Sequence, residues 1–145
     1  MTIVAYRDGI MAADSVGWTG SATVKSPVAP KIKRLPDGGL IGCGGNTSEI
    51  VRVCAWMINP SLPTPTLDKD ECFSAIWVKP DGSLWLGGYD LNFYQLYDQF
   101  FAIGSPTAFV FGALHAGASA EAAVQLAIDH TDSVGGKIQV ERLTP

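Results

Sequence analysis

The chain contains little histidine and little charge. Two of its 145 residues are histidine and 17% are Asp, Glu, Lys or Arg, whereas 47% are hydrophobic. The scarcity of histidine leaves few ways to build a serine–histidine hydrolase, and the hydrophobic content excludes a disordered chain. The net charge of -4 provides no broad basic surface, so we expect neither nucleic acid nor anionic membranes to bind.

Cysteine is also scarce, and no targeting segment is expected. Cys43, Cys54 and Cys72 are odd in number and too widely spaced for a zinc ribbon or a redox pair, which favours a reducing compartment. We expect each to be a small buried side chain, although Cys43 is also a candidate for lining a site.

The N-terminus has no positive run followed by an apolar stretch, so the predicted location is the cytoplasm.

Apolar runs long enough to cross a membrane are missing too. The most apolar region, residues 100–128, is broken by glycine, proline and polar residues, and it predicts buried helices instead. A chain of this length fits one domain, residues 1–145, with a substantial core.

Three Gly-containing turns between short β-prone runs predict hairpins. Asp8-Gly9 provides the positive φ of a tight turn, and Pro36-Asp37-Gly38-Gly39 and Pro80-Asp81-Gly82 are also typical turn sequences. The runs are apolar on both faces, which is typical of sheets covered on both sides. The predicted strand pairs are 2–6 with 10–14, 31–35 with 40–43, and 73–78 with 84–87.

The pattern of apolar residues predicts three helices, two of which begin at a polar cap. Together with the hairpins they indicate two stacked sheets sandwiched by helices, with the last two helices side by side. Residues 88–99 receive no assignment. The other predicted elements are a helix capped by Asn46, Thr47 or Ser48 that stops at Asn59-Pro60, a strand ending at 102–105, a helix over 107–114, a helix over 120–130 capped by Ser119, and a closing strand over 137–143.

Amide hydrolysis needs a nucleophile, a base and an oxyanion site. His115 lies in a predicted apolar helix and His130 at a helix end, where core and capping roles are expected. Thr2 offers a base without histidine, because its small side chain permits removal of Met1 and so frees an α-amine. Such an amine has an unperturbed pKa of about 7.7–8.0, which suits general-base catalysis near neutral pH.

Two charged residues are predicted close to Thr2. With the first turn centred on Asp8, Asp14 is expected directly opposite Thr2, although a turn residue or a solvated charge is an equal alternative. Lys31, buried beside Asp14, would favour ionisation of the threonine hydroxyl, and an exposed strand lysine is the alternative. Lys33 is expected on the same strand face as Lys31.

The chain contains, in this order, Thr2-Ile3-Val4-Ala5-Tyr6, Gly9, Ala12-Ala13-Asp14-Ser15, Lys31-Ile32-Lys33-Arg34-Leu35, Gly42-Cys43-Gly44-Gly45 and Ala102-Ile103-Gly104-Ser105. This succession resembles the motifs of proteasome β-subunits and bacterial HslV peptidases, which are N-terminal nucleophile (Ntn) hydrolases, and it spans almost the whole chain. The resemblance implies an α+β fold, a four-layer αββα sandwich of two stacked antiparallel sheets, and a threonine endopeptidase that needs neither metal nor organic cofactor.

The resemblance also assigns catalytic roles. Thr2 would be the nucleophile and, through its freed amine, the base; Lys31 would activate the nucleophile and Asp14 would support the lysine. We prefer Lys31 to Lys33 because the family's lysine is followed by an apolar residue and a short run ending in leucine. Lys33 is then expected to be a surface charge.

Two further segments match the family's site. The main-chain N–H of Gly45 would stabilise the oxyanion, with Gly44 as its neighbour, although these glycines would also suit a strand end. Ser105 would hydrogen-bond the terminal amine and relay protons, whereas a serine after glycine and before a helix is usually an N-cap.

Three features depart from the family pattern. The first hairpin is shorter, with the loss shared between its strands. Asp132 and Ser133 precede Gly135-Gly136 at a shifted position, so they are either supporting residues of the site or plain loop residues. Pro106 replaces the small residue usual after the serine.

Three functional hypotheses follow. The first is a peptidase that acts on peptides or unfolded proteins and forms a homo-oligomeric ring, with the existence of an ATPase partner left open. The second is a catalytically inert proteasome-like structural or assembly subunit, because retention of Met1 would leave Thr2 without a free amine. The third is an Ntn amidase acting on a small molecule.

Overall fold

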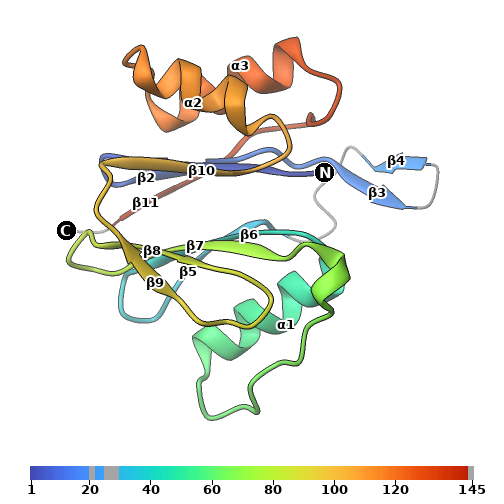
Figure 1. Cartoon of the computed structure of the whole chain (residues 1–145), viewed down its shortest axis with the longest axis vertical. Helices are drawn as coiled ribbons and strands as arrows, with labels where there is room; N and C mark the ends of the chain where they lie inside the picture. The colour runs from blue at the N-terminus through green and yellow to red at the C-terminus, as the bar shows by residue number, and fades with distance from the viewer. Residues whose placement is uncertain (20–21, 25–29, 144–145) are drawn as a thin grey trace.

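Helices cover both outer faces of a pair of stacked sheets in the computed structural model, which describes residues 1–19, 22–24 and 30–143. Figure 1 shows α2 (Thr107–His115) and α3 (Ala120–His130) over one sheet and α1 (Thr47–Ile58) under the other. The predicted αββα sandwich is therefore confirmed.

The sheet beneath α2 and α3 has four antiparallel strands. Its order is β10 (Phe100–Gly104), β1 (Ile3–Arg7), β2 (Ile10–Ala13) and β11 (Gln139–Arg142). The predicted first hairpin and closing edge strand are confirmed. The three buried residues of β2 are apolar, as expected for a strand covered on both faces.

The second sheet has five antiparallel strands and packs on α1. It contains the two other predicted hairpins and, within the segment left unassigned, β9. In order across the sheet the strands are β5 (Ile32–Arg34), β6 (Leu40–Gly44), β7 (Ser74–Val78), β8 (Leu84–Gly87) and β9 (Tyr94–Leu96).

Besides β9, a short hairpin and a 3-10 turn were not predicted. A separate hairpin pairs β3 (Gly17–Thr19) with β4 (Ala22–Val24), and a 3-10 turn, η1, covers Lys69–Glu71. Elements of three residues are too short for apolar periodicity to reveal.

The N-caps of α1 and α3 are polar residues that the sequence predicted. Asn46 is the N-cap of α1 and accepts a hydrogen bond from Ser48 N at 2.9 Å, which decides among the three candidate caps. Ser119 caps α3 by accepting from Ala122 N at 3.1 Å. None of the helices in the described part of the chain is long and apolar enough to cross a membrane.

The register of the first hairpin differs from the prediction. Asp8 (φ 50°) and Gly9 (φ 79°) both have a left-handed backbone conformation. The turn therefore has two central residues and is not centred on Asp8. Val4 consequently pairs with Ala13, which places Asp14 opposite Ile3. The prediction that Asp14 lies directly opposite Thr2 is wrong by one residue.

The core between the sheets depends on one close approach. A Cβ on Gly42 of β6 would lie 2.7 Å from both Met11 Sδ and Val4 Cγ1 of the other sheet. Glycine at this position therefore lets the two sheets pack closely, just before the segment that carries Gly44 and Gly45.

The cysteines occupy two kinds of environment. Cys43 on β6 and Cys54 on α1 are buried in the core between α1 and its sheet, as expected. Cys72 follows η1 with a left-handed backbone conformation (φ 55°) and is exposed. The expectation that Cys72 is buried is therefore wrong.

Candidate active site

A buried ion pair joins the two sheets near the N-terminus. Asp14 directly follows β2 of the four-stranded sheet, and Lys31 directly precedes β5 of the five-stranded sheet. Lys31 Nζ lies 2.8 Å from Asp14 Oδ1, and the two side chains are 9% and 0% exposed. Separating such a pair would leave a buried charge without compensation, so the two side chains hold each other in place.

Main-chain donors surround the carboxylate of Asp14. Oδ1 also accepts from Ile3 N at 3.1 Å, while Oδ2 accepts from Val16 N at 3.3 Å and Gly135 N at 3.2 Å. A buried carboxylate needs such partners. They fix its orientation, with Oδ1 toward Lys31.

The ammonium group of Lys31 has three oxygen acceptors. Besides Asp14 it donates to Val16 O at 2.7 Å and to Met1 O at 3.2 Å. Burial lowers the pKa of Lys31, and the charge and hydrogen bond of Asp14 partly offset this. Because the carbonyl of Met1 is bonded to the nitrogen of Thr2, the positive charge lies beside the Met1–Thr2 peptide group.

Thr2 is held between the ends of two strands. It is only 7% exposed, and its carbonyl accepts from Ser105 N at 2.7 Å, just beyond β10. A Cβ on Gly104 would lie 1.8 Å from that carbonyl oxygen, and Gly104 has a φ of +120°, so this position requires glycine. On the other side, a Cβ on Gly44 would lie 3.4 Å from Thr2 Cγ2.

Gly45 lies between β6 and the N-cap of α1. Its φ is +125° and a Cβ would come within 3.1 Å of Phe73 Cα, so a larger residue would be strained. Its backbone is exposed, and it directly follows Gly44, at which an added Cβ would touch Thr2. A main-chain N–H near a helix N-terminus suits a developing negative charge.

The remaining predicted residues lie at different distances from Thr2. Ser105 is adjacent to it, and its hydroxyl lies 3.1 Å from Met1 Sδ. Asp132 is exposed, and Ser133 Oγ lies 3.5 Å from Thr131 Oγ1 within the same loop. It is the main chain of Gly135, farther along that loop, that reaches Asp14.

The side chains of the two lysines near β5 diverge. Ile32 packs into the core between the sheets, and Lys33 instead lines a hollow with Ile50 and Cys54 on the side of α1. The expectation that Lys31 and Lys33 share a face is wrong, because Lys31 lies before the strand and the alternation of side chains does not extend to it.

Gln139 was missed from the sequence. Its side chain accepts from Lys31 N at 3.1 Å and donates to Asp14 O at 3.0 Å. A glutamine on an edge strand has no feature that distinguishes it from a surface residue, and only the meeting of three separate segments reveals these contacts.

The terminal amine is influenced by the same charges. Burial, followed by the positive charge of Lys31, lowers the pKa of the Met1 amine below its ordinary value of 8.0, whereas Asp14 opposes the change. An amine at this end of the chain is therefore neutral at a lower pH than an amine in solvent.

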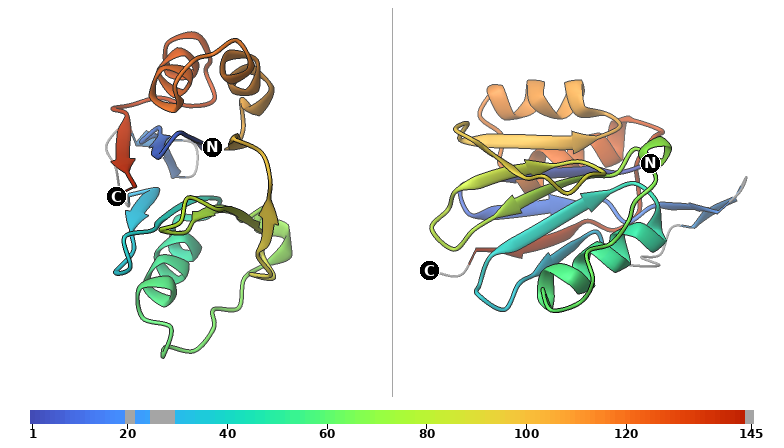
Figure 2. Two further views of the ribbon diagram at one scale, coloured as in Figure 1. Left: turned by 90° about the vertical axis from the view of Figure 1, so that its left-hand side faces the viewer. Right: turned by 60° about the horizontal axis from the view of Figure 1, so that its bottom comes forward.

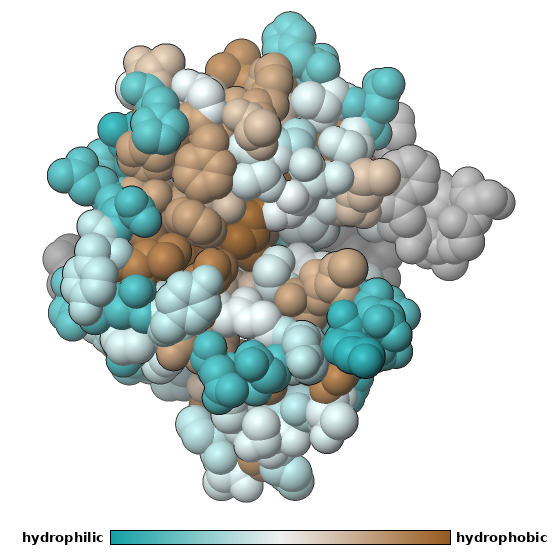
Figure 3. Space-filling view, in the orientation of Figure 1, coloured by the Kyte–Doolittle hydropathy of each residue, from teal (hydrophilic) through white to brown (hydrophobic). Residues whose placement is uncertain are grey.

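A large hollow opens near Thr2. It measures about 700 Å³, and its walls include Ser74, Leu86, Tyr94 and Ile103. A Cβ built on Gly44 would lie 3.7 Å from Ser74 Oγ and 3.4 Å from Thr2 Cγ2, so Ser74 lies close to Thr2. Figure 3 shows apolar residues gathered on this face of the molecule.

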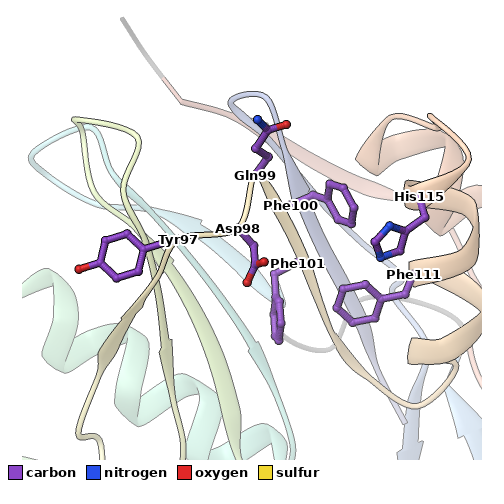
Figure 4. A pocket seen from close by; sticks show the side chains of 7 residues that line it. All are labelled: Tyr97, Asp98, Gln99, Phe100, Phe101, Phe111 and His115. Atoms are coloured by element: carbon purple, nitrogen blue, oxygen red, sulfur yellow. The ribbon is translucent and has the colours of Figure 1, made fainter.

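His115 lies at the other end of the four-stranded sheet. It is exposed rather than part of the core, and its ring lies 4.9 Å from that of Phe100 and 6.3 Å from that of Phe111. Figure 4 shows it lining a separate hollow with Asp98. Phe100 pairs with Arg7, whereas Thr2 precedes the opposite end of β1, so His115 does not belong to the site.

Solved structures with the same fold are known. The chain is similar to BPH of Thiobacillus denitrificans in complex with epoxomicin, with a TM-score of 0.68 and 16% identity over 99% of both chains. It is also similar to eukaryotic HslV from Trypanosoma brucei, with a TM-score of 0.66 and 18% identity over 97% of this chain and 98% of that one. No family model and no curated protein matches the sequence. The resemblance to HslV is thus confirmed for the fold.

Removal of one partner of the ion pair should destabilise the protein strongly. Asp14→Ala leaves the ammonium of Lys31 buried without its counter-charge, so we expect the free energy of unfolding to fall by about 3–5 kcal/mol. Chemical denaturation measures this change.

Two controls accompany this measurement. Asp14→Leu combined with Lys31→Met removes both charges and should recover only part of the loss, because the main-chain N–H groups of Ile3, Val16 and Gly135 then lack their acceptor. Glu141→Gln removes the exposed Arg34–Glu141 pair and should cost at most about 1 kcal/mol. A loss for Asp14→Ala as small as that for Glu141→Gln would contradict the importance of the buried pair.

Proposed function

We propose that this chain is a threonine peptidase that uses Thr2 as an N-terminal nucleophile after Met1 is removed. The observation that carries the proposal is the buried Lys31 ammonium, paired with Asp14 and 3.2 Å from the carbonyl oxygen of Met1. A fixed positive charge beside the Met1–Thr2 peptide group favours ionisation of the threonine hydroxyl and keeps a nearby amine neutral.

The reaction proceeds in two halves. The freed amine of Thr2 accepts the proton of its own hydroxyl, and the oxygen attacks the carbonyl carbon of the substrate. The main-chain N–H of Gly45 stabilises the resulting oxyanion. The protonated amine of Thr2 then donates this proton to the departing amine nitrogen of the substrate, which leaves an ester between substrate and Thr2.

Hydrolysis of the ester regenerates the site. The neutral amine accepts a proton from water, whose oxygen attacks the ester carbonyl, and the acid product leaves as the proton returns to the Thr2 oxygen. Ser105, next to Thr2, is suited to hydrogen-bond the amine during both halves. Lys31 remains protonated throughout and acts by its charge.

The similar structures are consistent with this proposal. BPH is described in complex with epoxomicin and the trypanosomal protein is an HslV. We extend to this chain the HslV-like action on peptides or unfolded proteins and assembly into a homo-oligomeric ring. Asp132 and Ser133 remain proposed supporting residues.

The two other candidate functions, an inert subunit and a small-molecule amidase, each differ from the peptidase in a property that can be measured. The carbonyl of Met1 accepts a hydrogen bond from Lys31 Nζ. A protein that retains Met1 has an amide nitrogen in place of the base and is the inert subunit considered above. A monomer that hydrolyses only small amides would instead be the amidase.

Replacement of the nucleophile tests the proposal. Thr2→Ala removes the attacking oxygen, so turnover of internally quenched peptides should fall by at least about 1,000-fold, while Thr2→Ser should retain measurable activity. Mass spectrometry should show that the active chain begins at Thr2. Unchanged turnover by Thr2→Ala would refute the mechanism, and a chain that keeps Met1 in its natural host would support the inert subunit.

The proposal also predicts the pH dependence. Because only the neutral amine accepts the hydroxyl proton, kcat/KM should rise with pH along an acid limb. Burial and the charge of Lys31 lower the pKa of an amine at this end of the chain, so the midpoint should lie below 8.0. Lys33→Met, on the side of α1, should leave the midpoint unchanged. A pH–rate profile with its midpoint at or above 8.0 would contradict the predicted environment.

The hollow beside Thr2 predicts a preference among substrates. Its apolar walls suit a large apolar side chain next to the cleaved bond, so kcat/KM for phenylalanine should exceed that for alanine by at least about tenfold. Tyr94→Ala removes one wall and should reduce the ratio. Tyr97→Ala, whose side chain is 87% exposed and lies outside the hollow, is the control. Equal ratios in all three proteins would show that this hollow does not receive the side chain.

A further inference from the structure

Gln139 connects the main chains of both members of the buried ion pair. It is the first residue of β11, and it pairs with Ala13, the residue before Asp14. Its Oε1 accepts from Lys31 N at 3.1 Å and its Nε2 donates to Asp14 O at 3.0 Å. One side chain thus links the residue that follows β2 to the residue that precedes β5.

The chemistry of these bonds requires a side-chain amide. Lys31 N is a donor and Asp14 O is an acceptor, so the bridging group must accept at one atom and donate at the other. A carboxylate would turn a second acceptor toward Asp14 O, and a thioether of the same length would bond neither group well. The amide of Gln139 therefore acts as a peptide group would between two strands.

Gln139 supplies one of two main-chain attachments of Lys31. The carbonyl of Lys31 accepts from Cys43 N of β6 at 2.8 Å, and its N–H donates to Gln139. These bonds come from different sheets and fix the backbone from which the lysine side chain extends. Without Gln139, the main chain of Lys31 would keep its bond to β6 and lose its bond to the sheet that carries Asp14.

The edges of the two sheets meet along these strands. β11 contacts β5, and Figure 2 shows them next to each other at one side of the sandwich. Farther along the same strands, Arg34 Nη2 lies 3.0 Å from Glu141 Oε2, and both side chains are 39% exposed. The Arg34–Glu141 pair thus joins the same two strands outside the site.

We infer that Gln139 is a positioning residue, which holds Lys31 and Asp14 so that the ammonium lies beside Thr2. This inference rests on the proposed function, in which the charge of Lys31 favours ionisation of the Thr2 hydroxyl. The charged groups that face Lys31 are the carboxylate of Asp14 and the terminal amine. Gln139 itself is neutral and acts on Lys31 only through the main chain.

Steady-state kinetics of Gln139→Met test the inference. The variant keeps the length and volume of the side chain and loses both hydrogen bonds. A displacement of the ammonium by a fraction of an ångström to 1 Å should lower kcat by about 10- to 100-fold. KM should change by less than about twofold, because Gln139 does not line the hollow proposed for the substrate.

Glu141→Gln is the matched control, since it removes the charge from an ion pair that joins β5 and β11 outside the site. It should leave kcat and KM within about twofold of the starting protein. Equal kinetics for Gln139→Met and Glu141→Gln would overturn the inference, as would a rise in KM with unchanged kcat. If Gln139→Met does not fold, Gln139→Glu provides the test, because it keeps the acceptor for Lys31 N and loses the donor to Asp14 O.

A measurement without turnover separates this inference from the proposed function. NMR of a chain with labelled lysine side chains gives the pKa of Lys31 in the unsubstituted protein and in Gln139→Met. Burial lowers this pKa and Asp14 opposes the change, so weaker contact with Asp14 should lower the pKa further. An unchanged pKa in a folded variant would refute the positioning role. If the unsubstituted protein cleaves no peptide, but Gln139→Met still lowers the pKa of Lys31, only the proposed function is refuted.

Discussion

The contact between Lys31 and Asp14 is the constraint on which the site depends. Each residue lies at the end of a strand in a different sheet, and the pair is almost fully buried. Such a pair persists only where both charges have further partners. Here the partners are main-chain groups of Ile3, Val16 and Gly135, together with the carbonyl of Met1.

Close backbone approaches then place Thr2 beside the ion pair. Gly104 lets the end of β10 approach the carbonyl of Thr2, and Gly44 lets β6 approach its side chain. Larger residues at these positions would move Thr2 relative to Lys31. Thr2, the ammonium of Lys31 and the exposed Gly45 backbone are therefore positioned by strand ends.

In the proposed mechanism, the same arrangement makes activity depend on removal of Met1. While Met1 is attached, the nitrogen of Thr2 belongs to a peptide bond and is not a base, although the fold and the ion pair are already in place. The shared fold with proteins of 16% and 18% identity shows that the sandwich tolerates extensive substitution. Function must accordingly be argued from the residues around Thr2.

The sequence by itself determined the layers, the three hairpins and the polar caps of α1 and α3, because local turn chemistry and apolar periodicity control these features. The choice of Lys31 as the charged partner of Asp14 came from the family resemblance. The sequence placed Asp14 opposite the wrong residue, since a two-residue turn at Asp8-Gly9 shifts the register by one. Only the tertiary structure showed that the side chains of Lys31 and Lys33 diverge, and only it revealed the contacts of Gly135 and Gln139. Those contacts arise where segments distant in the chain meet across two sheets, and no local pattern encodes the distance between them.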